Sequence, residues 1–321
     1  MEVLITGIGG MVGTHLTDLL WSTGIKPHGF FYNSTVPISE VGGKCFAYEC
    51  DVRDFLHTYR LMEKIRPQVI YHLAAQSYPG VSWAQPALTL DINLTGTVNI
   101  FEAVKLIKVA SPDYDPVIVV ACSSAEYGAS LIPEKTPIGE NELLLPLSPY
   151  GVSKVGQDLL AYQYFMSSGL KSIRARIFNT TGPRKVGDAP SDFVRRALDV
   201  EAGRAGTLKV GNLTTRRAIT DVRDLVKALK LLAEHGAPGE AYNISGQAVY
   251  SMEYVIETIQ KLCHRPMPIE QDSALMRPID EPVIWGDSTK LFKATGWTQE
   301  ITLEKTIADM LDYWRNREGS V

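Results

Sequence analysis

Tyr150 and Lys154, in the segment "SPYGVSK", form a pair that could exchange a proton with a hydroxyl or a ketone. Their i,i+4 spacing places both side chains on one face of a predicted helix, about one turn apart. A free tyrosine has a pKa of about 10, too high for efficient acid–base catalysis at neutral pH. A desolvated ammonium nearby favours the phenolate, so the pair predicts a tyrosine adapted to proton transfer.

The segment "ITGIGGMVGTHL" places glycines directly after a predicted strand and at the start of a predicted helix. Gly7 would allow a tight turn, Gly10 the close approach of a pyrophosphate, and Gly13 close packing of helix on sheet. The free N–H groups of the helix would then face the phosphates. Together with the tyrosine–lysine pair, the loop predicts hydride chemistry on a dinucleotide bound by Gly7, Gly10, Met11, Val12, Gly13, Tyr150 and Lys154.

Residues after the next strands should contact the rest of the cofactor. An acidic residue after the second strand would favour NAD and an arginine NADP, but "FFYNSTVP" offers neither, so either cofactor is expected near Asn33. Asp51, beside Val52, could bind the adenine amine or cap the following helix. Small side chains in "HLAAQS" would let the dinucleotide lie against the fourth strand, at Leu73, Ala74 and Ala75.

Short aliphatic runs alternate with helical stretches over residues 1–178, which is typical of a parallel sheet covered on both faces. Strands are predicted at 3–6, 29–32, 44–50, 69–73, 117–122 and 172–178, and helices at 11–22, 54–65, 87–109 and 149–167. The fold class is therefore α/β, a Rossmann-type doubly wound parallel sheet that forms a dinucleotide-binding domain.

The pattern changes after residue 179, where strands become short. They are expected at 208–210, 241–244 and 267–269, with helices at 193–202, 221–234, 251–262 and 303–314. Residues 179–321 are predicted to form a smaller, mixed α/β C-terminal substrate lobe interleaved with the first domain. One of its strands or helices could return to the large sheet.

The composition of the 321-residue chain is that of a globular protein, with 45% hydrophobic and 21% charged residues and a net charge of −4. This balance predicts no nucleic-acid partner and no membrane partner. No apolar run approaches the roughly 20 residues of a membrane helix. The four cysteines lack metal-ligand spacing, so no metal site and a cytoplasmic location with free thiols are expected.

The chain resembles the extended short-chain dehydrogenase/reductase family over nearly its whole length, in the branch that modifies nucleotide sugars. The resemblance is carried by "TGIGGMVG", "HLAAQS", "ACSSAEYG", "SPYGVSK", "RIFNTTGP" and "RRAITDVRD". The segments "KVGNLTTRRAITDVRD" and "MRPIDEPVIWGDSTKLFKATGW" are similar to those of GDP-mannose 4,6-dehydratases and GDP-4-keto-6-deoxy-mannose reductases, the second especially to the reductases. The resemblance implies Ser123, Tyr150 and Lys154 as catalytic residues, with Ser123 hydrogen-bonding the C4 oxygen of the sugar.

The resemblance also implies residues that bind a small-molecule substrate, a sugar linked to GDP or another nucleotide. Arg217 and Arg277 match arginines that hold the diphosphate or ribose, which agrees with the bidentate pairing of guanidinium and phosphate. Asn93 matches an asparagine that supports the active site. A homodimer through the helices at 87–109 and 149–167 is implied as well. The substrate-binding residues are expected to be Ser124, Glu126, Asn179, Arg184, Val210, Arg217 and Arg277.

Ala125 separates the reactions that the family performs. The 4,6-dehydratases place a glutamate there to remove the C5 proton, which a methyl group cannot do. Glu126 would face away from the sugar in an extended strand, unless the turn breaks the alternation. Reductases often carry Glu where Ala125 stands and Asp where Ala218 stands.

The predicted reaction is therefore reduction of the C4 ketone of a GDP-4-keto-6-deoxy-hexose by NAD(P)H, with Tyr150 as proton donor. The product would be GDP-D-rhamnose or its C4 epimer. A 4-epimerase with tightly held NAD is the alternative. A 4,6-dehydratase or an inactive cofactor-binding regulator is less expected.

Overall fold

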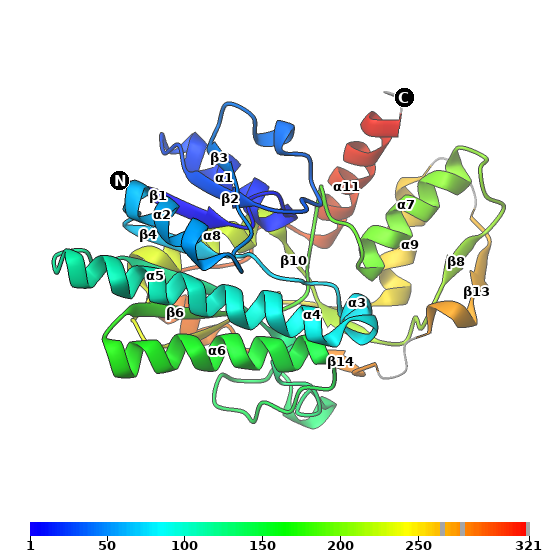
Figure 1. Cartoon of the computed structure of the whole chain (residues 1–321). Coiled ribbons are helices and arrows are strands. Elements are labelled where there is room, and N and C mark those ends of the chain that lie inside the picture. The colour runs from blue at the N-terminus through cyan, green and yellow to red at the C-terminus, as the bar shows by residue number, and fades with distance from the viewer. Residues whose placement is uncertain (264–266, 277–279, 319–321) are drawn as a thin grey trace.

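A parallel sheet of seven strands organises the chain (Figure 1). The computed structural model describes residues 1–263, 267–276 and 280–318. In spatial order the strands are β11 (Ala241–Ile244), β6 (Lys171–Ile177), β5 (Val117–Ser123), β4 (Val69–His72), β1 (Val3–Thr6), β2 (His28–Phe31) and β3 (Phe46–Glu49), and each neighbouring pair is parallel. This confirms the predicted Rossmann-type class, with the strand order reversing between β1 and β4.

Helices cover both faces of this sheet, which explains the apolar runs in its central strands β1, β4 and β5. One face carries α2 (Phe55–Ile65), α5 (Gly96–Ala110) and α6 (Pro149–Ser168). In Figure 1, α5 and α6 run side by side along that face. The opposite face carries α1 (Met11–Ser22), α8 (Val222–His235) and α10 (Thr289–Thr295).

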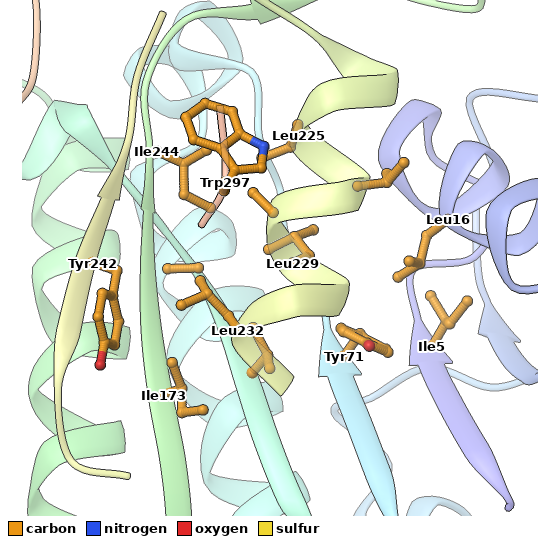
Figure 2. Packing of buried hydrophobic residues seen from close by; sticks show 14 of the residues in the cluster. Ile5, Leu16, Tyr71, Ile173, Leu225, Leu229, Leu232, Tyr242, Ile244 and Trp297 are labelled. Carbon is orange, nitrogen blue, oxygen red and sulfur yellow. The ribbon is translucent and has the colours of Figure 1, made fainter. Parts of the chain in front are cut away.

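Trp297 packs at the end of the core between α8 and the sheet, beside Leu225 and Ile244 (Figure 2). The indole is almost fully buried and its Nε1–H donates to the carbonyl of Asp224 at 2.9 Å. Such a large aromatic group contributes much of the apolar area that a core buries. The elements α8, α10 and β11 all come from beyond residue 179, so the later part of the chain returns three described elements to the large sheet.

A second hydrophobic cluster lies in the C-terminal part of the chain. Its helices are α7 (Ala189–Glu201), α9 (Met252–Leu262) and α11 (Leu303–Glu318). Three small sheets accompany them: β8 (Leu208–Val210) with β13 (Ile269–Gln271), β9 (Arg216–Ala218) between β12 (Val249–Ser251) and β14 (Val283–Ile284), and β7 (Thr180–Thr181) with β10 (Thr220–Asp221). The sequence analysis missed most of these two- and three-residue strands, because so short a run carries no periodicity.

The predicted helix over 87–109 is interrupted by a change of helical type. It comprises α4 (Pro86–Leu90), a π-helical turn η2 (Asp91–Thr95) and α5, and it is preceded by the unpredicted α3 (Pro79–Ala84). Single π-helical turns inside α-helices often mark functional sites. The remaining short elements are the 3-10 turns η1 (Ile38–Val41), η3 (Ser124–Glu126), η4 (Pro133–Lys135) and η5 (Ser273–Leu275).

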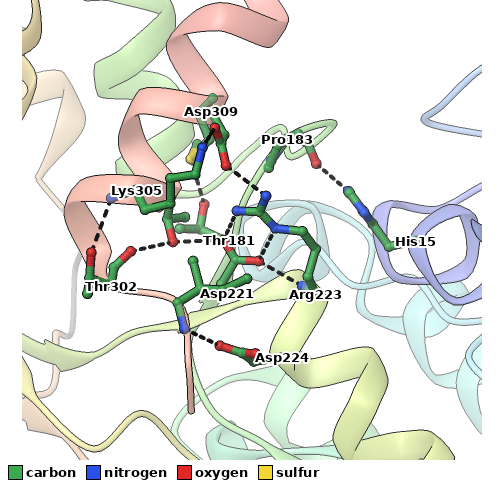
Figure 3. Close-up of polar contacts among 12 residues, drawn as sticks. His15, Thr181, Pro183, Asp221, Arg223, Asp224, Thr302, Lys305 and Asp309 are labelled. Carbon is green, nitrogen blue, oxygen red and sulfur yellow. Dashed lines mark hydrogen bonds and ion pairs between the residues drawn. The ribbon is translucent and has the colours of Figure 1, made fainter. Parts of the chain in front are cut away.

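Two buried aspartates fasten the start of α8 to the C-terminal segment (Figure 3). Asp221 caps α8 and accepts a hydrogen bond from the Thr306 hydroxyl at 2.7 Å. Asp224 accepts from the backbone N–H groups of residues 300 and 301 at 3.0 and 2.8 Å. No helix within the described ranges is long and apolar enough to span a membrane.

We expect Asp224→Ala to lower the free energy of unfolding by about 2–4 kcal/mol, because the backbone N–H groups of residues 300 and 301 lose the buried carboxylate that accepts from them. Asp312→Ala is the control, since Asp312 is 70% exposed and lies 3.6 Å from Arg315; its effect should stay below about 0.5 kcal/mol. Urea unfolding followed by tryptophan fluorescence measures both. Equal effects for the two variants would contradict a special role for Asp224.

Candidate active site

The carboxyl end of β5 and the first turn of α6 bring the predicted catalytic residues together. Ser123 is the last residue of β5, and Tyr150 lies in the first turn of α6, where the Ser148 side chain caps the helix by accepting from Gly151 N–H at 3.1 Å. The Ser123 side chain lies close enough to the Tyr150 hydroxyl to lower the pKa of the phenol. This edge of the sheet is where open α/β folds bind their ligands.

Lys154 lies one turn further along α6 and faces the same end of β5. Its Nζ donates to the carbonyl of Ala121 at 2.8 Å and is 5.8 Å from the centroid of the Tyr150 ring. Burial lowers the pKa of Lys154 to about 8, against the opposing effect of the nearby Cys122 and Glu126. The ammonium therefore remains mostly protonated at neutral pH.

Tyr150 carries its proton in this arrangement. Burial raises the pKa of Tyr150 to about 12, and the Ser123 side chain only partly offsets this rise. This shift opposes the phenolate that the ammonium was expected to favour, and burial is its largest cause. A neutral phenol is a proton donor, which suits reduction of a ketone.

The turn η3 brings Ala125 against the start of α6. A Cβ atom added to Gly151 would lie 2.6 Å from the Ala125 carbonyl oxygen, so the helix can approach β5 this closely only with glycine there. Ala125 is partly exposed, whereas Ser124 on one side of it is only 7% exposed. The side chain at this partly exposed position is therefore a methyl group and not a carboxylate.

Glu126 points into the protein. It is completely buried, its Oε1 accepts from the Ser123 backbone N–H at 2.7 Å, and its Oε2 lies 3.5 Å from Nε of Arg176. The turn does break the strand alternation, but the capping interaction with Ser123 still directs the carboxyl group inward. In this position the side chain of Glu126 cannot touch a substrate.

The glycine loop has the geometry expected of a diphosphate site. Gly7 has φ +74°, and a Cβ there would lie 2.8 Å from Ala74 N; one on Gly13 would lie 2.4 Å from the Gly7 carbonyl oxygen. A Cβ on Gly10 would meet only that carbonyl, at 3.3 Å, so its outer side is open. The helix begins without a side-chain cap or an acidic residue in its first turn, at Met11 and Val12. These observations fit a bound diphosphate.

The residues predicted to contact the adenosine end lie around the ends of β2 and β3. Asn33 is exposed with φ +49°. Asp51 is ion-paired with Arg53 at 2.6 Å, which holds the pKa of that carboxyl below its usual value. Asp54, rather than Asp51, caps the following helix. Val52 is buried, whereas the residues that follow β4 are partly exposed: Leu73, Ala74 and Ala75.

Two of the predicted substrate residues lie near the ends of β6 and β9. Asn179 follows β6, and its buried Oδ1 has no hydrogen-bond partner among the described residues. Arg217, in β9, donates to Asp280 Oδ1 at 2.7 Å and to the Glu281 carbonyl at 2.8 Å. Arg277 lies outside the described residues.

Arg184 and Val210 lie elsewhere. Arg184 forms ion pairs at 2.7 Å with Asp18 of α1 and with Glu40 of η1. Its loop is fastened to α1, because the Pro183 carbonyl lies 3.0 Å from Nε2 of His15 (Figure 3). Val210 is 1% exposed within the C-terminal core. Neither residue is brought to Ser123, Tyr150 and Lys154 by a contact in the structure.

A hydrogen-bond chain behind Tyr150 starts from the π-helical turn. Asn93 is completely buried, accepts from Gln76 N–H at 2.8 Å and donates to Ser153 Oγ at 2.8 Å. Ser153 in turn donates to the Tyr150 carbonyl at 2.7 Å. The sequence analysis identified Asn93 but missed Ser153 and Gln76. The i,i+3 spacing of Ser153 from Tyr150 is the signal that could have found it.

Comparisons with known proteins identify the family of the chain. The family model described as GDP-mannose 4,6 dehydratase matches residues 4–310. A curated relative, GDP-6-deoxy-D-mannose reductase of Pseudomonas aeruginosa, is 27% identical over 98% of each chain. These matches confirm the resemblance inferred from the sequence segments.

Solved structures match over the whole chain as well. RMD from Pseudomonas aeruginosa complexed with NADPH has a TM-score of 0.85 and 27% identity, covering 98% of this chain and 99% of its own. UDP-glucose 4-epimerase from Brucella ovis in complex with NAD has a TM-score of 0.84 and 26% identity over 98% of each chain. With the family model spanning nearly all of the sequence, the chain belongs to the GDP-mannose 4,6-dehydratase family.

Proposed function

We propose that the protein is an NAD(P)H-dependent reductase of the C4 ketone of a GDP-4-keto-6-deoxy-hexose. The observation that carries this proposal is the grouping of Ser123, Tyr150 and Lys154 beside Ala125, with Glu126 turned into the interior. The site has a proton donor but offers no carboxylate for removing a C5 proton. The similarity to the Pseudomonas aeruginosa reductase supports the choice of substrate.

The chain's own residues perform the acid–base half of this reaction. NADPH or NADH, when bound at the glycine loop, supplies the hydride that adds to C4. The hydroxyls of Ser123 and Tyr150 bind the ketone oxygen, and Tyr150 gives its proton to that oxygen as negative charge develops on it. The ammonium of Lys154 stabilises the phenolate that remains.

The same geometry assigns roles around the catalytic group. Gly7, Gly10 and Gly13 hold the diphosphate of the cofactor against the start of α1. Asn179 offers its unpaired Oδ1 to the substrate. Arg217, whose guanidinium is ion-paired with Asp280, is assigned to the nucleotide from the resemblance. We extend the proposal to a cytoplasmic enzyme, a location that suits four free cysteines.

A panel of nucleotide sugars with NADPH and with NADH tests the reaction. We expect oxidation of the reduced cofactor only with a GDP-linked 4-keto sugar. Interconversion of 4-hydroxy sugars without added cofactor would establish the epimerase instead, which the similarity to the Brucella ovis enzyme makes the second candidate. Formation of a 4-keto-6-deoxy product from GDP-mannose would overturn the inference from Ala125.

Replacement of Tyr150 by phenylalanine removes only the phenolic hydroxyl. We expect kcat to fall by about 10²–10⁴-fold, the usual contribution of a positioned acid, while the Kd for the sugar nucleotide changes little. Steady-state kinetics and calorimetric binding measure the two quantities. Tyr162→Phe is the control, because Tyr162 is an exposed residue of the same helix. Nearly unchanged turnover in Tyr150→Phe would refute the assignment.

We also propose a homodimer that pairs α5 and α6 with their copies in a second chain. Exposed apolar residues follow α6 at seven-residue spacing, namely Val152, Leu159 and Met166, at 48%, 52% and 63% exposure. Val109 of α5 is 76% exposed. Exposed apolar residues repeated along one helix are typical of a contact between chains.

Leu159→Glu should dissociate this dimer, because the carboxylate would lie between apolar helices. Light scattering should then give the 35.4 kDa of one chain instead of twice that mass. Phe292→Glu is the control, since Phe292 is 53% exposed on α10, across the sheet from α6. The dimer proposal fails if wild-type protein already has the mass of one chain.

A further inference from the structure

A buried group of charged side chains lies behind the catalytic residues, and the proposed reaction does not use it. Asp158 and Glu126 have side chains with no exposure, and that of Arg176 is 5% exposed. Nε of Arg176 is 2.8 Å from Asp158 Oδ2 and 3.5 Å from Glu126 Oε2. Arg174 adds a second contact to Asp158, at 2.8 Å. Asp158 therefore accepts hydrogen bonds from both arginines, whereas Glu126 accepts one from neither.

The one hydrogen bond that Glu126 makes in the described structure connects it to the active site. Its Oε1 accepts from the N–H of Ser123 at 2.7 Å, while its Oε2 has no hydrogen-bond partner among the described residues. Ser123 Oγ in turn accepts from Ala125 N–H at 3.2 Å, which completes a reciprocal cap of the turn. The same Ser123 side chain interacts with Tyr150, whose pKa it lowers.

We propose that Glu126 is a positioning residue of the reductase. Its carboxyl group fixes the backbone of Ser123 so that the serine hydroxyl meets Tyr150, and its charge acts on Tyr150 and Lys154 from the interior side of the site. The proposal rests on the proposed function for the roles of these residues. It assigns no contact between Glu126 and substrate or cofactor.

The charges around Glu126 set the direction in which it shifts the pKa values of its neighbours. Burial, with Asp158 adding to it, raises the pKa of Glu126 to about 8, and Arg176 and Lys154 oppose the rise. Once ionised, Glu126 raises the pKa values of Lys154 and Tyr150.

Two other titratable groups face the lysine. The thiol of Cys122 has a raised pKa because it is buried, and His72 is neutral because burial lowers its pKa to about 3. Without the carboxylate of Glu126, Lys154 and Tyr150 should lose their protons at lower pH.

Two variants separate the hydrogen bond from the charge. Glu126→Gln keeps an oxygen for the Ser123 N–H but cannot ionise, so the alkaline limb of the kcat/KM profile should move to lower pH, by on the order of one unit. Glu126→Asp keeps the charge but is one methylene too short for the N–H, so kcat should fall while the limb stays near its wild-type pH. An exposed carboxylate, Glu142, ion-paired with Lys135, provides the control variant Glu142→Gln.

A measurement without turnover keeps this test independent of the substrate. Lysine labelled with ¹³C at Cε gives the pKa of Lys154 by NMR, with Lys154→Ala used to assign the signal. The midpoint should be lower in Glu126→Gln than in the wild type, whichever nucleotide sugar the enzyme accepts. Superimposable Lys154 titrations in folded wild type and Glu126→Gln would overturn the proposed charge effect. An unchanged kcat in Glu126→Asp would overturn the positioning role.

Discussion

The close contact between α6 and the end of β5 is the constraint on which the site depends. The helix can lie against the turn after β5 because Gly151 has no side chain to strike the Ala125 carbonyl. That approach allows Tyr150 to reach the Ser123 hydroxyl and Lys154 to reach the Ala121 carbonyl. Any residue larger than glycine would move the helix and separate the proton donor from the serine.

Burial has opposite effects on the two titratable members of the pair. It raises the pKa of Tyr150 and lowers that of Lys154, because a low-dielectric site disfavours the charged form of each. The two pKa values move apart, to about 12 for Tyr150 and about 8 for Lys154, so at neutral pH the tyrosine keeps its proton and the lysine keeps its charge. The same burial makes the inward-facing Glu126 influential, since its charge is poorly screened there.

Much of the fold was predictable from the sequence because nearly continuous apolar runs and helical stretches alternate over residues 1–178. The parallel sheet follows from that pattern, and the glycine loop from the spacing of Gly7, Gly10 and Gly13. The spacing of Tyr150 and Lys154 likewise placed them on one helix face. Their grouping with Ser123 was predicted from a resemblance, since it joins segments far apart in the chain.

Other features depend on tertiary contacts that a linear pattern does not contain. The π-helical turn around Asn93 has no signature in the spacing of apolar residues. Arg184 was expected near a nucleotide because it follows the predicted substrate loop, yet it is ion-paired with Asp18 and Glu40. The raised pKa of Tyr150 reflects desolvation, which depends on how other elements cover the ring.

The place of β11 in the large sheet sets an order for folding during synthesis. β6 lacks its outer neighbour until residue 244 has left the ribosome, and Trp297 completes the core beside α8 later still. The nascent nucleotide-binding half therefore emerges with an open strand edge and an uncovered apolar face, both of which favour aggregation. A chaperone that covers this half until the C-terminal segment has been synthesised would prevent the aggregation that the topology favours.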